Sequence, residues 1–197
     1  RSIVGETVLS ALDHFGVPYR LLDLASIRPT AEVFAGCAAI LIGQNRLGDR
    51  LSAEETRLLI EAVRDGVGLV NFDNDLRRYD PGLLEIFGFE GLNPHLAATN
   101  ELCVTGGGHW ITAEHGVNEF HRFERMVSAV LVSRWGPATQ PLADLVLGRE
   151  QLQYIRHLSP GSAFEPRNHP CLFAARFGRG RAVQFLLNPR VWRRAFF

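Results

Sequence analysis

The fold of this chain is decided by residues 51–75, which read LSAEETRLLIEAVRDGVGLVNFDND. Ser52 and Glu55 form a capping-box pattern, in which each side chain satisfies a backbone N–H group that a helix start leaves unpaired. The pattern predicts a helix that begins just after Ser52 and ends at Gly66, because glycine favours the left-handed conformation of a helix C-terminus. Residues 67–72 are mostly apolar and predict a strand buried on both faces of a sheet.

Further helix and strand patterns precede this unit. Apolar residues at helical spacing predict a helix over residues 5–15, followed by strands at 19–23 and 38–42 with a short helix at 30–36 between them. Strand 38–42 is entirely apolar, so we expect it to neighbour strand 67–72 and to be buried on both faces. This alternation predicts an α/β fold, a three-layer αβα sandwich with a doubly wound, mostly parallel, flavodoxin-like sheet.

The pattern changes after a helix predicted at residues 81–87. Three strand-like segments follow, at 96–104, 125–134 and 143–147. Polar, glycine-rich connections separate them, so we expect antiparallel additions to the sheet in the C-terminal half. A final hairpin is predicted at residues 171–187, where apolar strands flank the turn sequence FGRG. The whole chain, residues 1–197, is expected to form a single domain.

Composition excludes several classes of function. The chain has 197 residues, of which 46% are hydrophobic, and its 21 basic residues balance its 21 acidic residues. We therefore expect neither a nucleic acid nor a membrane as a partner. All the basic residues are arginine, which removes any lysine nucleophile. Cys37, Cys103 and Cys171 are odd in number and far apart, and are expected to be buried thiols.

The two ends of the sequence predict a context within a longer protein. The chain begins at Arg1 without a methionine and finishes on the apolar Phe197. We expect it to be excised from a longer chain, with other domains of the same protein or a homo-oligomer as partners. The cytoplasm is favoured as its location, although a removed signal peptide would also explain the missing methionine.

Polar side chains follow the two central predicted strands. Gln44 and Asn45 come after strand 38–42, and Asp73, Asn74 and Asp75 come after strand 67–72. The carboxyl ends of neighbouring parallel strands form a crevice where ligands bind. The two aspartates suit acid–base chemistry, metal binding or a solvated turn, and the amides suit hydroxyl groups. Because amides and carboxylates outnumber cations in this group, we expect a small, neutral, hydroxylated ligand.

A second group of polar residues follows a run of three glycines, Gly106 to Gly108. It interleaves histidines with glutamates: His109, Glu114, His115, Glu119 and His121. Gly116 interrupts any helix that would align them, and their spacing matches no standard zinc pattern. We therefore expect no metal and no cofactor. The glycine run lacks the helix of a phosphate cradle, so we expect a flexible loop that lets His109 wall the crevice.

Three segments together point to a known superfamily. They are the helix and strand at 52–73, the sequence GHWIT at 108–112, and the sequence AARFGRGRAV at 174–183. They resemble the class I glutamine amidotransferase-like superfamily, especially its ThuA-like (trehalose-utilisation) and β-galactosidase-trimerisation-like branches. These branches typically have a loop of the H-P-I-T kind and a final G-x-G-R hairpin. The resemblance spans most of the chain and implies the same α/β sandwich.

The catalytic residues of glutamine amidotransferases are missing from the matching positions. Those enzymes place a cysteine on a tight elbow after the strand that corresponds to 67–72, where this chain has Asp73. They place a histidine in a V-Q-F-H-P-E context, where this chain has Leu186 in VQFLLNP. Amide hydrolysis by this route needs a thiolate beside an imidazole. The resemblance therefore implies the fold without amidotransferase activity.

Two hypotheses for function remain. The leading one is a noncatalytic or accessory domain of a larger, carbohydrate-related protein, which binds a ligand or contacts other domains or subunits. The alternative is a ThuA-like enzyme that acts on a sugar or polyol through Asp73 and His109, with Gln44 as a further candidate. The alternative requires Asp73 and His109 to converge in one pocket.

Overall fold

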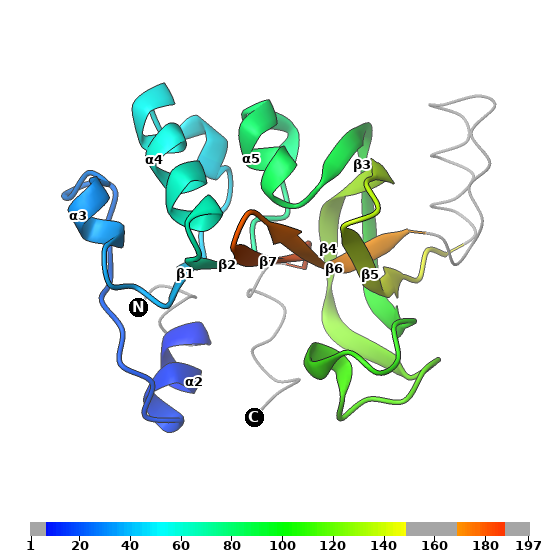
Figure 1. Cartoon of the computed structure of the whole chain (residues 1–197). Helices are drawn as coiled ribbons and strands as arrows, with labels where there is room; N and C mark the ends of the chain where they lie inside the picture. Colours follow the sequence, from blue (N-terminus) through cyan, green and yellow to red (C-terminus); the bar gives the residue numbers. More distant parts are fainter. Residues whose placement is uncertain (1–6, 149–168, 188–197) are drawn as a thin grey trace.

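A computed structural model describes residues 7–148 and 169–187, in which seven strands form one mixed sheet of order β1-β2-β7-β6-β5-β3-β4 (Figure 1). The strands are β1 (Ala39–Ile42), β2 (Gly68–Asn71), β3 (Phe89–Val104), β4 (Phe120–Trp135), β5 (Thr139–Leu145), β6 (Pro170–Phe177) and β7 (Gly180–Phe185). The α-helices are α2 (Val8–His14), α3 (Ala31–Phe34), α4 (Ala53–Arg64) and α5 (Pro81–Ile86). Short 3-10 helices are η1 (Leu47–Asp49), η2 (Leu76–Arg78) and η3 (Trp110–Thr112). No helix within the described ranges is long and apolar enough to cross a membrane.

Helix α4 and strand β2 form where predicted, but β2 is fully buried on one face only, because Gly68 and Val70 are half-buried. The Ser52 hydroxyl accepts a hydrogen bond from the Glu55 N–H at 3.3 Å, and the Glu55 carboxylate accepts one from the Ser52 N–H at 2.8 Å. The helix begins at Ala53, and Gly66 has a positive φ of 121° just after its end. Arg28 adds an ion pair to Glu55 from outside the helix. The local sequence signals therefore set both ends of this helix.

The sheet is mixed, so the prediction of a mostly parallel sheet is wrong. Strands β1 and β2 are parallel neighbours as predicted, and β2 also pairs in parallel with β7. The four other strand pairs of the described residues are antiparallel. The reason is that the C-terminal hairpin places β7 beside β2, and β6 then returns in the opposite direction. The predicted hairpin and antiparallel additions are confirmed.

Strand β1 is not buried on both faces, contrary to the prediction. No strand forms at residues 19–23, so among the described residues β1 lies at the edge of the sheet. Its Leu41 side chain is 41% exposed. Without a paired strand outside it, β1 keeps an open side despite its apolar sequence. The helix predicted at 5–15 begins outside the described residues, and its described part is α2.

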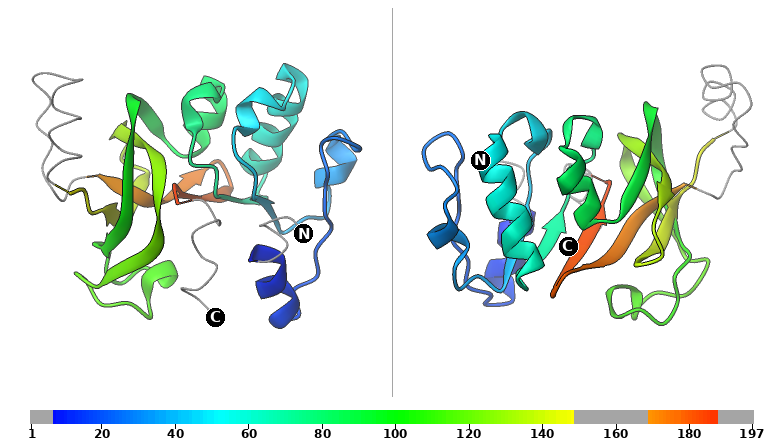
Figure 2. Two further views of the ribbon diagram at one scale, coloured as in Figure 1. Left: turned by 180° about the vertical axis from the view of Figure 1, so that it is seen from behind. Right: turned by 45° about the horizontal axis from the view of Figure 1, so that its top comes forward.

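The two faces of the parallel strands are covered differently. Helices α3, α4 and α5 lie on one side of the sheet, and α2 lies on the other side near β1 (Figures 1 and 2). The core under α4 and α5 includes Leu59, Leu69 and Leu83, each at most 3% exposed. Successive strand residues point to opposite faces, so Val70 and Val183 belong to the other face, where they are only half-buried. This second face carries the cavity described below.

Candidate functional site

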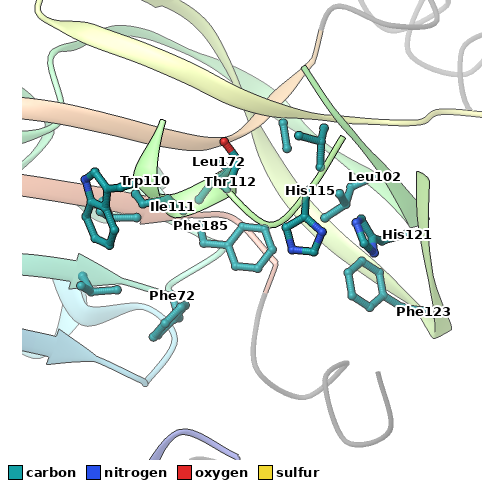
Figure 3. Close-up of a pocket in the computed structure, with 14 residues that line it drawn as sticks. Phe72, Leu102, Trp110, Ile111, Thr112, His115, His121, Phe123, Leu172 and Phe185 are labelled. Atoms are coloured by element: carbon teal, nitrogen blue, oxygen red, sulfur yellow. The ribbon is translucent and has the colours of Figure 1, made fainter. Parts of the chain in front are cut away.

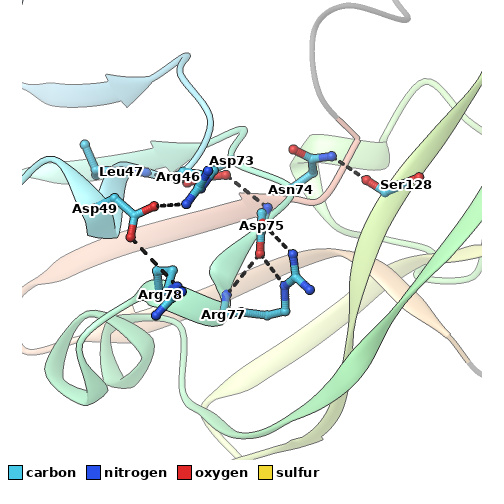
Figure 4. Close-up of polar contacts among 9 residues, drawn as sticks. All are labelled: Arg46, Leu47, Asp49, Asp73, Asn74, Asp75, Arg77, Arg78 and Ser128. Atoms are coloured by element: carbon cyan, nitrogen blue, oxygen red, sulfur yellow. Dashed lines mark hydrogen bonds and ion pairs between the residues drawn. The ribbon is translucent and has the colours of Figure 1, made fainter. Parts of the chain in front are cut away.

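Asp73 is enclosed at the end of β2 rather than presented in a crevice. Its carboxylate accepts hydrogen bonds from the Leu47 N–H at 2.8 Å and the Asp75 N–H at 3.0 Å (Figure 4). It also accepts one from the Tyr79 hydroxyl at 3.0 Å. Burial raises the pKa of Asp73, while the hydrogen bonds from Asp75 and Leu47 oppose that rise. The side chain is fully buried. Asp73 therefore ties the turn after β1 to the turn after β2.

Buried side-chain amides form a hydrogen-bond network next to Asp73. The Asn71 side-chain amide donates to the Tyr79 hydroxyl at 3.0 Å and to the Gln184 Oε1 at 2.8 Å. Gln184 in turn donates from Nε2 to the backbone carbonyl of Asp73 at 2.8 Å. Burial raises the pKa of Tyr79 well above its ordinary value, so its hydroxyl stays protonated. Sequence reasoning missed this network, whose one signal was a polar glutamine within the apolar β7.

Other residues predicted to bind a ligand lie at the carboxyl ends of β1 and β2, a region that we call the rim. They are outside any enclosed site. Gln44 and Asn45 are exposed. The Asn74 side chain donates to the backbone carbonyl of Ser128 in β4, which links the parallel strands to the antiparallel part. The ligand-binding roles of these residues stay predictions.

Three arginines that sequence reasoning missed line the same rim. Arg77 binds the Asp75 carboxylate through two hydrogen bonds of 2.8 Å and holds the pKa of Asp75 below its usual range (Figure 4). Arg46 lies 2.6 Å from Asp49, and Arg78 approaches the same carboxylate at 4.0 Å. Asp49 and Asp75 are thus occupied by ion pairs within the chain. This leaves less polar surface for a ligand than the sequence predicted.

A cavity of about 330 Å³ lies on the face of the sheet opposite helices α4 and α5 (Figure 3). Its floor is formed by alternate residues of β2 and β7 and the residue after β2: Val70, Phe72, Val183 and Phe185. Residues 105–119, which we call the cap loop, contribute Trp110, Ile111, Thr112 and His115 to its wall. Trp110 is 69% exposed, so its indole is accessible from solvent. The cap loop thus occupies the place where a doubly wound fold would put a helix.

Backbone contacts hold the cap loop against the sheet. Thr105 and Gly106 both donate from backbone N–H to the Leu142 carbonyl at 2.9 Å. The Thr112 hydroxyl donates to the Gly106 carbonyl at 2.6 Å. At Gly106 a Cβ atom would lie 2.8 Å from the Leu142 side chain, so only glycine permits this close approach. The glycine run is therefore an anchored segment and not merely a flexible one.

His109 serves the loop itself. Its Nδ1 accepts a hydrogen bond from the Ile111 N–H at 3.2 Å, which caps the start of η3. Neither His109 nor Asp73 is among the residues that line the cavity. The structure therefore does not bring Asp73 and His109 together there.

Two histidines and a glutamate meet at one end of the cavity. Glu119 Oε1 lies 3.2 Å from His115 Nδ1 and 3.1 Å from His121 Nε2, and both histidines line the cavity. Glu119 Oε2 accepts a hydrogen bond from the Gly116 N–H at 2.8 Å. That hydrogen bond, with His115, lowers the pKa of Glu119. His109 and Glu114 are outside this cluster of candidate ligand atoms.

None of the three cysteines is arranged as a nucleophile. All are free thiols; Cys103 and Cys171 are buried as predicted, and Cys37 is half-buried. Burial raises the pKa of Cys171 well above its ordinary value, which opposes thiolate formation.

Comparisons with known proteins bear on the fold. No protein-family model and no curated protein matches the sequence. Among solved structures, a ThuA-like protein from Parabacteroides merdae ATCC 43184 matches with a TM-score of 0.58 and 15% identity, over 93% of this chain and 72% of that one. The cytoplasmic protein STM1381 from Salmonella typhimurium LT2 matches with a TM-score of 0.56 and 14% identity, over 92% and 74%.

A third solved structure, the mmIFT52 N-terminal domain, matches with a TM-score of 0.55 and 14% identity, over 98% of this chain and 85% of that one. At these identities the likeness concerns the fold alone. The chain has a ThuA-like α/β fold.

Proposed function

We propose that this chain is an accessory domain of the class I amidotransferase-like superfamily that binds a small hydroxylated ligand without hydrolysing an amide. We place the ligand in the cavity under the cap loop. We further propose that the domain works within a larger, carbohydrate-related protein, where it contacts other domains or subunits. The link to carbohydrate rests on the ThuA-like resemblance.

The proposed lack of amide hydrolysis is supported by two positions. Asp73 stands at the elbow where an amidotransferase needs its cysteine, and its carboxylate is used by three hydrogen bonds of the chain itself. Leu186 stands in the histidine position and is completely buried. A nucleophilic thiol and the base that would activate it are both replaced there.

The observation that carries the proposal is the cavity itself. Its volume of about 330 Å³ falls at the lower end of the range of small-molecule sites, about 300–1,000 Å³. Phe72 and Phe185 offer apolar ring surfaces, and Trp110 stands at the wall with an accessible indole. His115 and His121 supply polar atoms at one end. A sugar ring suits a cavity with apolar ring surfaces and polar atoms at one end, because the sugar presents C–H groups on one face and hydroxyls at its edge.

The enzymatic alternative, through Asp73 and His109, has less support. Catalysis needs both groups within reach of one substrate, whereas Asp73 is fully buried and His109 caps η3. Neither side chain lines the cavity. We therefore favour binding over catalysis at this pair.

Calorimetric titration with monosaccharides, disaccharides and their phosphates tests the proposal. We expect a neutral sugar to bind the full chain, and we expect Val183→Phe, which places a ring inside the cavity, to abolish that binding. Trp110→Ala should weaken it. Phe15→Ala is the matched control, because Phe15 is a 76% exposed aromatic residue that does not line the cavity.

Two results would contradict the proposal. One is the absence of binding to any neutral sugar, and the other is binding that Val183→Phe and Trp110→Ala leave unchanged. Tighter binding of a phosphorylated sugar would instead favour a binding site at the rim, formed by Arg46, Arg77 and Arg78 (Figure 4).

A further inference from the structure

A cluster of His115, Glu119 and His121 sits at the junction of the cap loop and β4. Their candidate ligand atoms all lie within 4.8 Å of one another. Figure 3 shows the two imidazoles side by side at one end of the cavity, next to Phe123. Their rings are 4.7 Å apart between centroids and nearly perpendicular, so they are not stacked. Such an arrangement aims nitrogen atoms from both rings at the same carboxylate.

The two distances from Glu119 to the histidine nitrogens match those between neighbouring ligands of one metal ion. With metal–ligand bonds of about 2.0–2.1 Å, neighbouring ligand atoms lie about 3.3 Å apart in a tetrahedral site and about 2.9 Å apart in an octahedral one. Glu119 Oε1 lies 3.2 Å from the His115 nitrogen and 3.1 Å from the His121 nitrogen. Both separations fall between the two geometries.

One nitrogen of the cluster is buried and lacks a hydrogen bond. His121 Nε2 is inaccessible to solvent, and its 3.1 Å approach to Glu119 Oε1 is not aligned as a hydrogen bond. A buried polar atom without a hydrogen bond costs free energy. A metal ion bound to Nε2 would satisfy it with the neutral imidazole lone pair.

The backbone fixes two of the three side chains to the sheet. His121 is in β4 and pairs with Leu102 of β3, and the Glu119 carbonyl accepts from the Val104 N–H at 2.9 Å. Gly116 donates to the second carboxylate oxygen of Glu119, which is the kind of outer contact that orients a metal ligand. The site would therefore need little reorganisation, confined to His115 on the loop.

We propose that His115, Glu119 and His121 form a binding site for a divalent transition-metal ion, with Zn²⁺ as the best match. Two histidines and one glutamate are a known set for sites that keep a coordination position open. Both histidines line the cavity, so an ion held by them would lie at its wall. The inference does not rest on the proposed sugar binding, because the metal ion is expected to bind without any sugar.

Titration of the full chain, without a polyhistidine tag, with Zn²⁺ alone tests the site. We expect one Zn²⁺ per chain, measured by competition with a chromophoric chelator, and visible absorption bands of a nitrogen-coordinated ion when Co²⁺ is used. Glu119→Gln and His121→Ala should each weaken binding by more than about 100-fold, beyond the loss seen when only an outer partner is removed. Zn²⁺ should raise the thermal unfolding temperature of the unaltered chain but not that of Glu119→Gln or His121→Ala.

The cap loop offers matched controls for both residue types. Glu114→Gln and His109→Ala change the same kinds of side chain outside the cluster and should leave Zn²⁺ binding unchanged. Glu119→Gln preserves shape, so it keeps the test decisive if His121→Ala fails to fold. The inference is overturned if no Zn²⁺ binds, if binding survives Glu119→Gln, or if the control variants weaken it equally. In those cases the cluster is only a carboxylate paired with two imidazoles.

Discussion

Replacement of Asp73 separates a structural carboxylate from a functional one. In Asp73→Ala, the Leu47 N–H, the Asp75 N–H and the Tyr79 hydroxyl lose their acceptor. Each buried donor left unpaired costs about 1–3 kcal/mol, and we expect about 3–6 kcal/mol in total because water entering the space restores part of the loss. Burial raises the pKa of Asp73, because it disfavours the charged carboxylate. The substitution removes that buried charge, so we expect the loss of stability to fall toward the lower end of this range.

Asp73→Asn refines the same test. The amide keeps one acceptor oxygen but turns its NH₂ group toward a donor of the chain, so we expect a smaller loss of about 1–3 kcal/mol. Asp65→Ala is the control, because Asp65 is 76% exposed and its contact with Arg179 is long at 3.4 Å. Such exposed changes usually stay within about 0.5 kcal/mol.

Chemical denaturation followed by fluorescence measures all three variants. A total stability of about 5–15 kcal/mol is typical, so Asp73→Ala should shift the midpoint strongly. The reasoning is refuted if Asp73→Ala unfolds within about 0.5 kcal/mol of the unaltered chain. An unshifted stability combined with lost sugar binding would show that Asp73 is a ligand-binding residue after all.

Four further outcomes are expected. Leu69→Ala, at a site 1% exposed, should cost about 2–5 kcal/mol by chemical denaturation, and a loss below about 0.5 kcal/mol would remove β2 from the core. Gly180→Ala should destabilise the fold, because its Cβ would lie 2.1 Å from the Val63 carbonyl oxygen. Gly148→Ala is the control, because no atom of the described residues lies within 4 Å of its Cβ position, and equal unfolding midpoints for the two variants would contradict this. Burial raises the pKa of Asp144 to about 6. The folded state therefore holds that proton more tightly than the unfolded state. The free energy of unfolding falls as pH rises from about 4 to about 6, and Asp144→Asn should flatten this slope in unfolding measured against pH. The purified chain should release no ammonia from glutamine in a coupled assay, and release that survives purification would restore an amidotransferase hypothesis.

Sequence reasoning succeeded where the structure depends on local signals. The capping box of Ser52 and Glu55 defines α4, and the apolar residues 67–72 contain β2. The FGRG turn forms the final hairpin as predicted. Each of these features involves residues close in sequence, so the pattern carries the information needed to place it.

The sheet order was not predictable in the same way. It depends on β7, from the end of the chain, pairing with β2. Apolar segments such as 38–42 look alike whether they lie at the centre or the edge of a sheet. Whether a neighbouring strand forms at 19–23 decides between those positions, and that segment gave a misleading strand pattern.

The candidate site shows a second limit. Spacing rules for metal ligands assume a regular helix or strand, whereas His115 returns to Glu119 through a turn in which Asn118 has a positive φ of 68°. The cavity floor includes Val183 and Phe185, which flank the polar Gln184 in the sequence. The cavity lies on the face of the sheet that the cap loop covers. The sequence did not indicate which face that is.

The claim that the ligand site is the cavity, and not the polar rim, is tested most directly by amide and indole chemical shifts during titration with a neutral sugar. The account predicts shifts at Trp110, His115 and Phe185, which line the cavity, with Gln44 and Asp75 unchanged. Shifts confined to Gln44 and Asp75 would contradict it and return the site to the carboxyl ends of β1 and β2.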